Sequence, residues 1–500
     1  MSEAVDDDHH RCGAHLARCR ARRGRGNAGA VARRLGRVEQ ASRIVARIVE
    51  TGVRAYGVNT GVGALADTVV DRASQSLLSR SIVLSHACGV GPLLAAREVR
   101  AIIAAGIANF AHGHSGVRRE IVQHLAALLE HDCIPDVPSK GSAGYLVHNA
   151  HIALVLIGEG SAHLAGRRMS GREALAAIGL EPLVLGAKEG LSLVNGTACA
   201  TGLTAVALSR AERLLDWADA IAALTLEAAG CQIAAFDAAV LALRPSAGIE
   251  KVGATLRARL QAAALSPPPS AGARRMRLAF VRCRMRMGVA HDVFDISARV
   301  VDQELASVTD NPAVSGTPEQ PIVSSEAHAV APALGQAADS LAIALAQLGA
   351  ISERRMDRLV NPLVSGLPPF LASDAGSHSG FMIAQYTAAA LSNENRRLAA
   401  PAAMDGGLTS GLQEDFLAHP TAAAGKLLAV IDNAEYILAI ELMAAAQAQD
   451  FLAATAARAA GTDLVYQAVR EHVSHYGDER PLNGDIEAVC SLIRETAPPL

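Results

Sequence analysis

The sequence lacks most of the features that mark other protein classes. Aromatic residues make up only 3% of the 500 residues, and a formal net charge of -3 gives no overall field favouring nucleic acid or a membrane surface. The eight cysteines form no CxxC pair and no zinc-ligand spacing, so we expect reduced, buried thiols in a cytoplasmic protein. The histidines show no ligand spacing either, and we expect no metal.

Long hydrophobic runs are also missing. No stretch of about 18 consecutive strongly apolar residues occurs, so we expect no membrane span. The N-terminal residues 1–36 have no apolar region of the secretory type, and their composition predicts a disordered leader. The arginine-rich run within them is also typical of a transit peptide or a polyanion-binding segment.

Alanine and leucine are abundant, in long segments with apolar residues on nearly every face. These segments cover about 200–233, 328–360 and 421–459, and half of all residues are hydrophobic. A helix that is apolar all round is normally buried inside a bundle, and alternation typical of strands is scarce. We therefore predict a mainly α fold with long central helices packed as a bundle and a smaller mixed N-terminal part.

Composition also divides the chain. We expect an N-terminal domain carrying active-site loops over 37–200, and a central bundle with C-terminal helices over 201–500. The Pro-rich and Gly-rich segments 266–275 and 361–380 are predicted connectors. Helices that are apolar all round often bury faces against copies of themselves, so we expect a homo-oligomer.

Polar residues that are costly to bury recur in loops between the predicted helices. Singly, each has an ordinary interpretation, such as a turn with a capping asparagine, a core histidine or a solvated charged face. The loops contain Tyr56 and Asn59 (AYGVNTGVG), His86 (LSHACGVG), Asn195 (KEGLSLVNGTAC), Arg282 (VRCRMRMG), and Gln413 with Glu414 (TSGLQEDF).

The segment VPSKGSAGYLVHNAHIALVLIGEG, residues 137–160, has the form of an active-site loop. A Gly-rich turn runs into an apolar helix predicted over 145–160. The turn holds Ser142, Tyr145 and His148 where plain turn residues would suffice.

Together these motifs resemble one family, the aromatic amino acid lyases, and especially the histidine ammonia-lyases. The resemblance covers roughly residues 37 to 455, with motifs in the family's order: YGVNTGVG, RSIVLSHACGVG, GHSGVR, KEGLSLVNGT, SVTDNP, ISERRM, GLPPFL, SGFMIAQYTAAALSNEN and TSGLQED. It implies a mainly α fold, a homotetramer, and active sites assembled from three subunits.

One departure concerns the family's cofactor. Family members normally carry an Ala-Ser-Gly triad that cyclises into a methylidene-imidazolone, the electrophile that captures the substrate amine. Aligned from His151, this chain has Ser142-Ala143-Gly144 there, and aligned from Lys140 the triad is deleted. We therefore expect no cofactor, although Gly141-Ser142-Ala143, with serine in the middle, leaves an unusual cyclisation open.

Other departures surround the same site. The family's YSxRC is AFVRC here, so Ala279 replaces a tyrosine, and GNFHAE is SEAHAV, so Glu326 and Ala327 replace asparagine and phenylalanine. The resemblance implies that Tyr56 is the general base, with Glu326 also assigned a catalytic role. The predicted substrate-binding residues are Asn59, His86, Tyr145, Asn195, Arg282, Gln413 and Glu414.

These departures favour a substrate whose nitrogen needs no activation. A trimethylammonium group has no lone pair for the electrophile and leaves as neutral trimethylamine. We predict a small-molecule histidine betaine as substrate, with His86 and Glu414 toward the ring, Arg282 on the carboxylate, and Ala279 and Ala327 making room for methyl groups. The branch of the family that lacks the cyclised cofactor converts ergothioneine into thiourocanate, and we expect that reaction, with hercynine as another possible substrate.

Two other functions stay open at this point. A catalytically inactive homologue with a binding or regulatory role would explain the lost triad but not the retained Tyr56, Asn195, Arg282 and Glu414. A conventional ammonia-lyase or aminomutase would need the unusual ring at Ser142.

Overall fold

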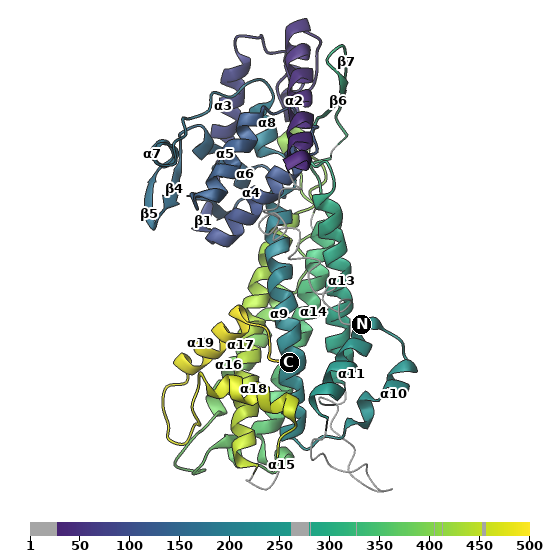
Figure 1. The fold of residues 1–500 in the computed structure, drawn as a ribbon, viewed down its shortest axis with the longest axis vertical. Helices are drawn as coiled ribbons and strands as arrows, with labels where there is room; N and C mark the ends of the chain where they lie inside the picture. Colours follow the sequence, from purple (N-terminus) through teal and green to yellow (C-terminus); the bar gives the residue numbers. More distant parts are fainter. Residues whose placement is uncertain are drawn as a thin grey trace. The chain divides into compact units, whose positions relative to one another are not determined.

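A computed structural model describes residues 28–261, 280, 282–326, 328–404, 406–412, 414–452 and 457–500, and Figure 1 shows their fold. The chain is mainly helical, as predicted. The helices are α2 Ala28–Thr51, α3 Gln75–His86, α4 Ala96–Phe110, α5 Arg119–Glu130, α6 Val147–Leu156, α7 Gly171–Ala177, α8 Glu189–Val194, α9 Ala198–Ala228, α10 Ala238–Ala242, α11 Ala247–Arg259, α13 Cys283–Leu305, α14 Pro332–Val360, α15 Pro362–Ser365, α16 Met382–Leu398, α17 Pro420–Phe451, α18 Ala460–Arg470 and α19 Asn483–Glu495. Short 3₁₀ helices are η1 Gly63–Leu65, η2 Ile233–Phe236, η3 Pro369–Leu371 and η4 Ser410–Leu412.

The three long helices predicted from apolar composition are confirmed as α9, α14 and α17. Their lengths are 31, 29 and 32 residues. The helix α2 begins at Ala28, inside the expected leader, because the amphipathic pattern of residues 28–51 continues back past residue 36. Residues 1–27 lie outside the described residues.

Two compact units divide the described residues. The first unit takes its residues from Met1–Leu208, Ala298–Ala338 and Pro401–Gly425, and the second from Ser209–Ser297, Asp339–Ala400 and Lys426–Leu500. The first boundary falls inside α9, and the expected division at residue 200 stays a prediction. The two later segments bring Glu326 and Glu414 into the first unit.

The first unit combines short helices with small antiparallel sheets. Strand β1 (Val90–Leu93) pairs with β3 (Pro138–Lys140), and β4 (Ser161–Leu164) pairs with both β2 (Ile134–Pro135) and β5 (Arg167–Ser170). A hairpin of β6 (Ala313–Thr317) and β7 (Gln320–Ser324) packs on α2. A core of buried α2 residues and Val314 joins the hairpin to the helix.

The second unit is the predicted helical bundle, and a buried polar network lies inside it. Arg355 of α14 forms two hydrogen bonds with Glu441 of α17, at 2.6 and 2.7 Å, and both side chains are fully buried. Thr225 of α9 donates to the same carboxylate at 2.8 Å, and His291 of α13 lies 3.1 Å from Asp219 of α9. These pairs satisfy the polar groups of an otherwise apolar interior and align the long helices.

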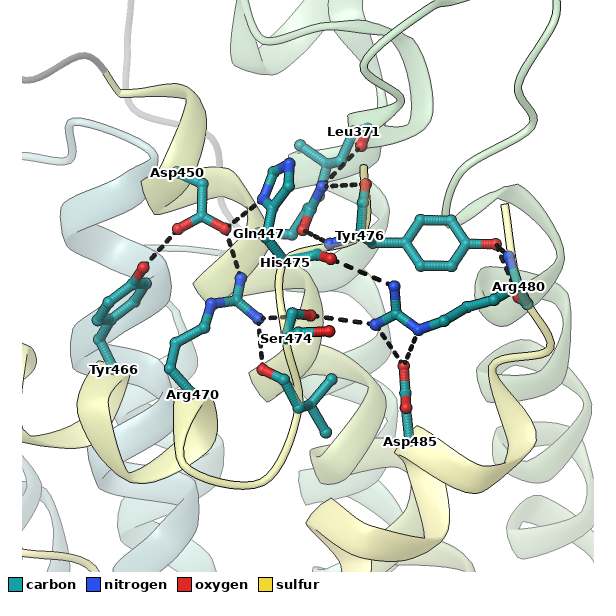
Figure 2. Close-up of polar contacts among 11 residues, drawn as sticks. Leu371, Gln447, Asp450, Tyr466, Arg470, Ser474, His475, Tyr476, Arg480 and Asp485 are labelled. Atoms are coloured by element: carbon teal, nitrogen blue, oxygen red, sulfur yellow. Dashed lines mark hydrogen bonds and ion pairs between the residues drawn. The ribbon is translucent and has the colours of Figure 1, made fainter. Parts of the chain in front are cut away.

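A second network fixes the C-terminal helices, as Figure 2 shows. Asp450 near the end of α17 accepts hydrogen bonds from Tyr466 at 2.5 Å, Arg470 at 2.6 Å and His475 at 2.7 Å. Arg480 pairs with Asp485 at 2.7 Å. A single carboxylate thus joins α17 to α18 and to the segment that follows α18.

Two described helical stretches are long and apolar enough by composition to cross a membrane, which differs from our expectation of none. They are Glu189–Ala228 and Pro332–Val360, and 94% and 67% of their most apolar windows are buried inside the structure. This burial is what core helices of a bundle show. The described cysteines are free thiols, and five of the six are buried.

Candidate active site

Three loops of the first unit meet around the predicted site. The loop after α2 contacts the segment at η4, since a Cβ on Gly63 would lie 2.7 Å from Ser410 Oγ. The loop before α6 contacts the start of α17, since a Cβ on Gly144 would lie 2.9 Å from Pro420 Cδ. Glycine permits both approaches, and both glycines have positive φ values, +55° and +142°.

Tyr56 lies half-buried at the centre of the first of these loops. Its hydroxyl oxygen accepts a hydrogen bond from the backbone N–H of Gly63 at 3.3 Å. A neighbouring Gly57, with φ +65°, allows close approach of Leu191 and Pro312. The role of Tyr56 as the general base stays a prediction.

The loop Gly141–Leu146 is held by its own hydroxyl groups and by α17. Ser142 Oγ donates to the carbonyl of Tyr145 at 2.9 Å and accepts from the N–H of Gly144 at 3.1 Å. Thr421 Oγ1 donates to the Gly144 carbonyl at 3.0 Å. Leu146 has φ +80°, a strained value for a residue with a side chain, and such strain persists only where neighbours fix it.

Tyr145 projects from this loop to Glu414. The Tyr145 hydroxyl donates to Glu414 Oε2 at 2.5 Å, across 269 residues of sequence. Burial raises the pKa of Tyr145 above its usual range, and the hydrogen bond and charge of Glu414 raise it further, as does a charge on Tyr56. Tyr145 is therefore a protonated donor.

His86 ends helix α3 next to the loop. A Cβ on Gly141 would lie 3.5 Å from Gly89 Cα, so the chain just after His86 contacts the loop. His86 Nδ1 lies 2.8 Å from the Ile82 carbonyl oxygen, and burial lowers the pKa of the imidazole. Because a carbonyl only accepts, Nδ1 carries the proton of a neutral ring and Nε2 is a bare acceptor.

Asn195 caps the C-terminus of α8 and faces the turn at Asn311. Its Nδ2 donates to the Asn311 carbonyl at 2.6 Å, and the Asn149 amide donates to the Asn195 carbonyl at 3.3 Å. Lys188 at the other end of α8 pairs with Asp310, one residue before Asn311. The position of Asn195 is thus fixed from both sides.

Asn59 has its amide engaged by its own loop. Its Oδ1 accepts from the Ala55 N–H at 2.8 Å, and its Nδ2 donates to the Val53 carbonyl at 2.9 Å. This is the capping role that the sequence alone offered as the ordinary interpretation. Contact with a substrate stays a prediction for this residue.

The remaining predicted site residues are not gathered with the others in the described structure. Glu326 is exposed at the end of the β6–β7 hairpin in the first unit, and Arg282 is exposed just before α13 in the second. Ala279, Ala327 and Gln413 lie outside the described residues. The roles assigned to these residues stay predictions.

From the sequence, the role of His148 stays open and Lys188 is one of several candidates to face a substrate sulfur, while His419 and Asp310 have no predicted role. His148 is 2% exposed, and its ring interacts with the backbone of Ser139. The backbone of His419 lies beside Gly144. Lys188 and Asp310 form a fully buried ion pair. The charged residues in KEGLSL and TDNP are visible in the sequence, but the sequence does not show that they pair. Among the residues that the structure describes, no cluster of three His, Cys, Asp or Glu side chains is arranged to hold a metal ion.

Comparison with known proteins decides the family. The family model described as aromatic amino acid lyase matches residues 20–471. This chain belongs to the aromatic amino acid lyase family. The histidine ammonia-lyase of Symbiobacterium thermophilum is 42% identical over 462 residues, 91% of this chain and 90% of that protein.

Solved structures agree with this assignment to the aromatic amino acid lyases. Histidine ammonia-lyase from Trypanosoma cruzi has a TM-score of 0.85 at 32% identity, covering 92% of this chain and 87% of the other. Ergothionase from Treponema denticola, solved with desmethyl-ergothioneine sulfonic acid, has a TM-score of 0.85 at 29% identity, covering 92% of each chain. The protein is a carbon–nitrogen lyase of this family, with a small amino-acid-like substrate.

The residues at the loop do not fit the methylidene-imidazolone that the family resemblance implies. The residue in the middle of the triad must lose a hydroxyl to give the methylidene carbon, and Ala143 has none. The nearest hydroxyl, that of Ser142, is engaged with the backbone at Tyr145 and Gly144. No catalytic step below is assigned to that group.

Proposed function

We propose that this lyase eliminates trimethylamine from a betaine of histidine, with ergothioneine as the substrate and thiourocanate as the product. The observation that carries the proposal is the sequence of this loop: aligned from His151 it has Ala143 where an amine-capturing electrophile would form, and aligned from Lys140 it lacks the triad. A primary amine leaves poorly without such an electrophile. A quaternary trimethylammonium departs as a neutral molecule and needs none.

In the proposed reaction Tyr56 removes a proton from the substrate β-carbon. The electrons of the broken C–H bond form the Cα–Cβ double bond, and the Cα–N bond breaks with its electrons going to nitrogen. Trimethylamine leaves with its lone pair, and the proton passes from Tyr56 to solvent. The backbone N–H of Gly63, 3.3 Å from the Tyr56 oxygen, supports the tyrosinate required for the first step.

The other predicted residues bind the substrate. His86 and Glu414 face the five-membered ring, Asn195 contacts the substrate and Arg282 pairs with the carboxylate. Glu326 supplies a negative charge for the trimethylammonium, and the ring of Tyr145 offers a face for it. Support for this set comes from the resemblance to histidine-specific relatives and from the meeting of three loops in the first unit.

The relatives favour a second candidate, release of ammonia from histidine. The name histidine ammonia-lyase belongs to relatives that are 42% and 41% identical to this chain over at least 90% of its length. That reaction would need the unusual ring built on Ser142, or another means of activating a primary amine. A homologue without catalytic activity, serving in binding or regulation, is the third outcome.

One experiment separates these functions. The purified protein is incubated with ergothioneine, hercynine or histidine at pH 7 to 10, with trimethylamine, ammonia and ultraviolet absorbance followed in parallel. Trimethylamine with a new chromophore supports the proposal. Ammonia from histidine, with an intact mass two waters lower than the sequence requires, establishes the second candidate. If the folded protein forms no product from any of these substrates, the result supports the third function, a binding or regulatory role without catalysis.

We also propose that the protein assembles as a homotetramer whose active sites combine several copies. Exposed apolar side chains on α13 and α16 support assembly: Val289, Ile296, Ile383 and Tyr386 are 47%, 51%, 56% and 64% exposed. Exposed Arg282 and Glu326 suit residues that reach a site only when another copy is present. Light scattering combined with size exclusion tests this, with a monomer as the contradicting result.

A further inference from the structure

The contact between Tyr145 and Glu414 restricts what Glu414 can do. The phenol donates to Oε2 at 2.5 Å, and Tyr145 stays protonated because burial and the carboxylate both raise its pKa. Carboxylate oxygens only accept hydrogen bonds, and the donating phenol fixes the position of this carboxylate. Tyr145 therefore holds Glu414 as an acceptor.

His86 offers a second acceptor next to the same loop. Its Nδ1 proton is directed to the Ile82 carbonyl at 2.8 Å and to Ser85 Oγ at 3.1 Å. The Ser85 hydroxyl itself donates to Ile82 at 3.2 Å, so it accepts from the ring. Burial lowers the pKa of His86 and keeps the ring neutral, which leaves Nε2 as a lone-pair acceptor.

Two acceptors together favour one kind of ring. Neutral imidazole has one N–H and one nitrogen without a proton. If Glu414 and His86 Nε2 face the two ring nitrogens, one of these acceptors meets the unprotonated nitrogen, and no hydrogen bond forms there. An imidazole-2-thione carries N–H on both nitrogens at neutral pH and satisfies both acceptors. The cost of one unmatched polar contact is enough to separate two ligands that are otherwise alike.

We propose that Tyr145 is a specificity-determining residue, which fixes Glu414 as a hydrogen-bond acceptor and so selects a ring with N–H at both nitrogens. This inference rests on the proposed function, in which His86 and Glu414 face the ring of a histidine betaine. The loop that carries Tyr145 is fixed by hydrogen bonds of Ser142 with Tyr145 and Gly144 and of Thr421 with Gly144.

The test compares ergothioneine with hercynine, which differ only in the sulfur and the ring proton. Their dissociation constants and their kcat and KM values are measured at pH 8, where the free imidazole of hercynine is neutral. The wild type is expected to bind the thione more tightly. Tyr145→Phe should reduce this preference about tenfold, the factor that one hydrogen bond to a charged group contributes. The reduction should appear in the ratio of KM values more than in the ratio of kcat values.

Two further variants keep the result interpretable. Glu414→Gln introduces an amide N–H, so it should shift the preference toward hercynine even if Tyr145→Phe does not fold. Tyr466→Phe removes a tyrosine–carboxylate hydrogen bond of the same length, 2.5 Å to Asp450, in the second unit (Figure 2). It should leave the thione preference unchanged.

The outcomes separate the inference from the function it rests on. If the wild type neither binds nor converts ergothioneine or hercynine, both the proposed function and the role of Tyr145 are rejected. A wild type that releases trimethylamine, with a thione preference that Tyr145→Phe and Glu414→Gln leave intact, rejects the role of Tyr145 alone. A general loss of activity with an unchanged preference also rejects it, because a structural defect lowers turnover of both ligands equally.

Discussion

Lys188 Nζ lies 3.0 Å from Asp310 Oδ2, and neither side chain has measurable solvent exposure. The ammonium also donates to the Ser115 carbonyl and to Ser192 Oγ, both at 2.8 Å. Burial lowers the pKa of Lys188 and the charge of Asp310 opposes that shift. The pair joins α8 to the turn that receives the Asn195 side chain, so it connects the stability of the first unit to the geometry of the site.

Removing one partner of this pair should destabilise the first unit strongly. Lys188→Met leaves a buried carboxylate without its cation, and breaking such a pair typically costs about 3–5 kcal/mol. Urea unfolding followed by circular dichroism measures the loss as a lower midpoint. Arg47→Gln, which removes an exposed ion pair with Glu50, is the control and should leave the midpoint nearly unchanged. A Lys188→Met protein as stable as the wild type would show that the ion pair contributes nothing.

The proton acceptor can be tested by removing a single oxygen. Tyr56→Phe should lower kcat roughly 10²–10⁴-fold, the usual contribution of a general base, with substrate affinity nearly retained. Stopped assays for trimethylamine give kcat, and calorimetry gives the dissociation constant. A variant that keeps its turnover would exclude Tyr56 as the base.

The close approach at Gly144 predicts a loop defect that lowers activity more than stability. In Gly144→Ala the new Cβ would lie 2.9 Å from Pro420 Cδ at a φ of +142°, so the loop must shift and carry Tyr145 away from Glu414. We expect kcat/KM to fall at least about tenfold, as for loss of one charge-assisted hydrogen bond. Gly166→Ala, at φ +76° with no atom within 4 Å, is the matched control for positive φ alone. Equal effects in both variants would contradict the crowding explanation.

The long helices could be predicted from sequence because their signal is local. Composition that is apolar on every face locates α9, α14 and α17, although the predicted segments run past the C-terminal ends of α9 at Ala228 and α17 at Phe451. The loop motifs could also be found, since glycines beside Tyr56 and Ser142 stand out against the surrounding helices. What the motifs could not give is the partner of each side chain.

Those partners are distant in the chain. Tyr145 and Glu414 are 269 residues apart, and Lys188 and Asp310 are 122 apart. The sequence assigns Tyr145 only to substrate binding, and the structure adds that its hydroxyl donates to the Glu414 carboxylate. Such pairings form because segments 298–338 and 401–425 pack in the first unit. No local sequence pattern predicts that these two segments belong to it.

Glu326 offers a test of how the trimethylammonium is recognised. Glu326→Gln removes a charge while keeping the shape, so it should weaken binding of a trimethylated substrate more than binding of its primary-amine counterpart, which can donate hydrogen bonds instead. Inhibition constants of the two ligands measure the difference. Glu319→Gln, at the exposed turn between β6 and β7, is the control. Equal weakening of both ligands would contradict a role at the quaternary nitrogen.

His148 predicts a loss of stability in mild acid. Burial lowers the pKa of this imidazole below its value of about 6.5 in an unfolded chain, so the unfolded state binds the proton more readily. The contribution of neutral His148 is therefore complete above about pH 6.5 and declines as the pH falls through the folded-state pKa. The pKa of His151 is lowered in the same direction, chiefly by burial, and adds to the effect.

Replacing this histidine should remove part of the acid sensitivity. His148→Leu replaces a buried neutral imidazole with an apolar side chain of similar size, so it should cost little stability at pH 7.5. Its Tm should fall less than the wild-type Tm between pH 7.5 and pH 5.5, and the remaining fall reflects His151 and His86. His131→Gln, an exposed histidine at the end of α5, should keep the wild-type pH dependence. If His148→Leu loses as much Tm in acid as the wild type, the buried imidazole is not the sensitive group, and protonation elsewhere must account for the loss.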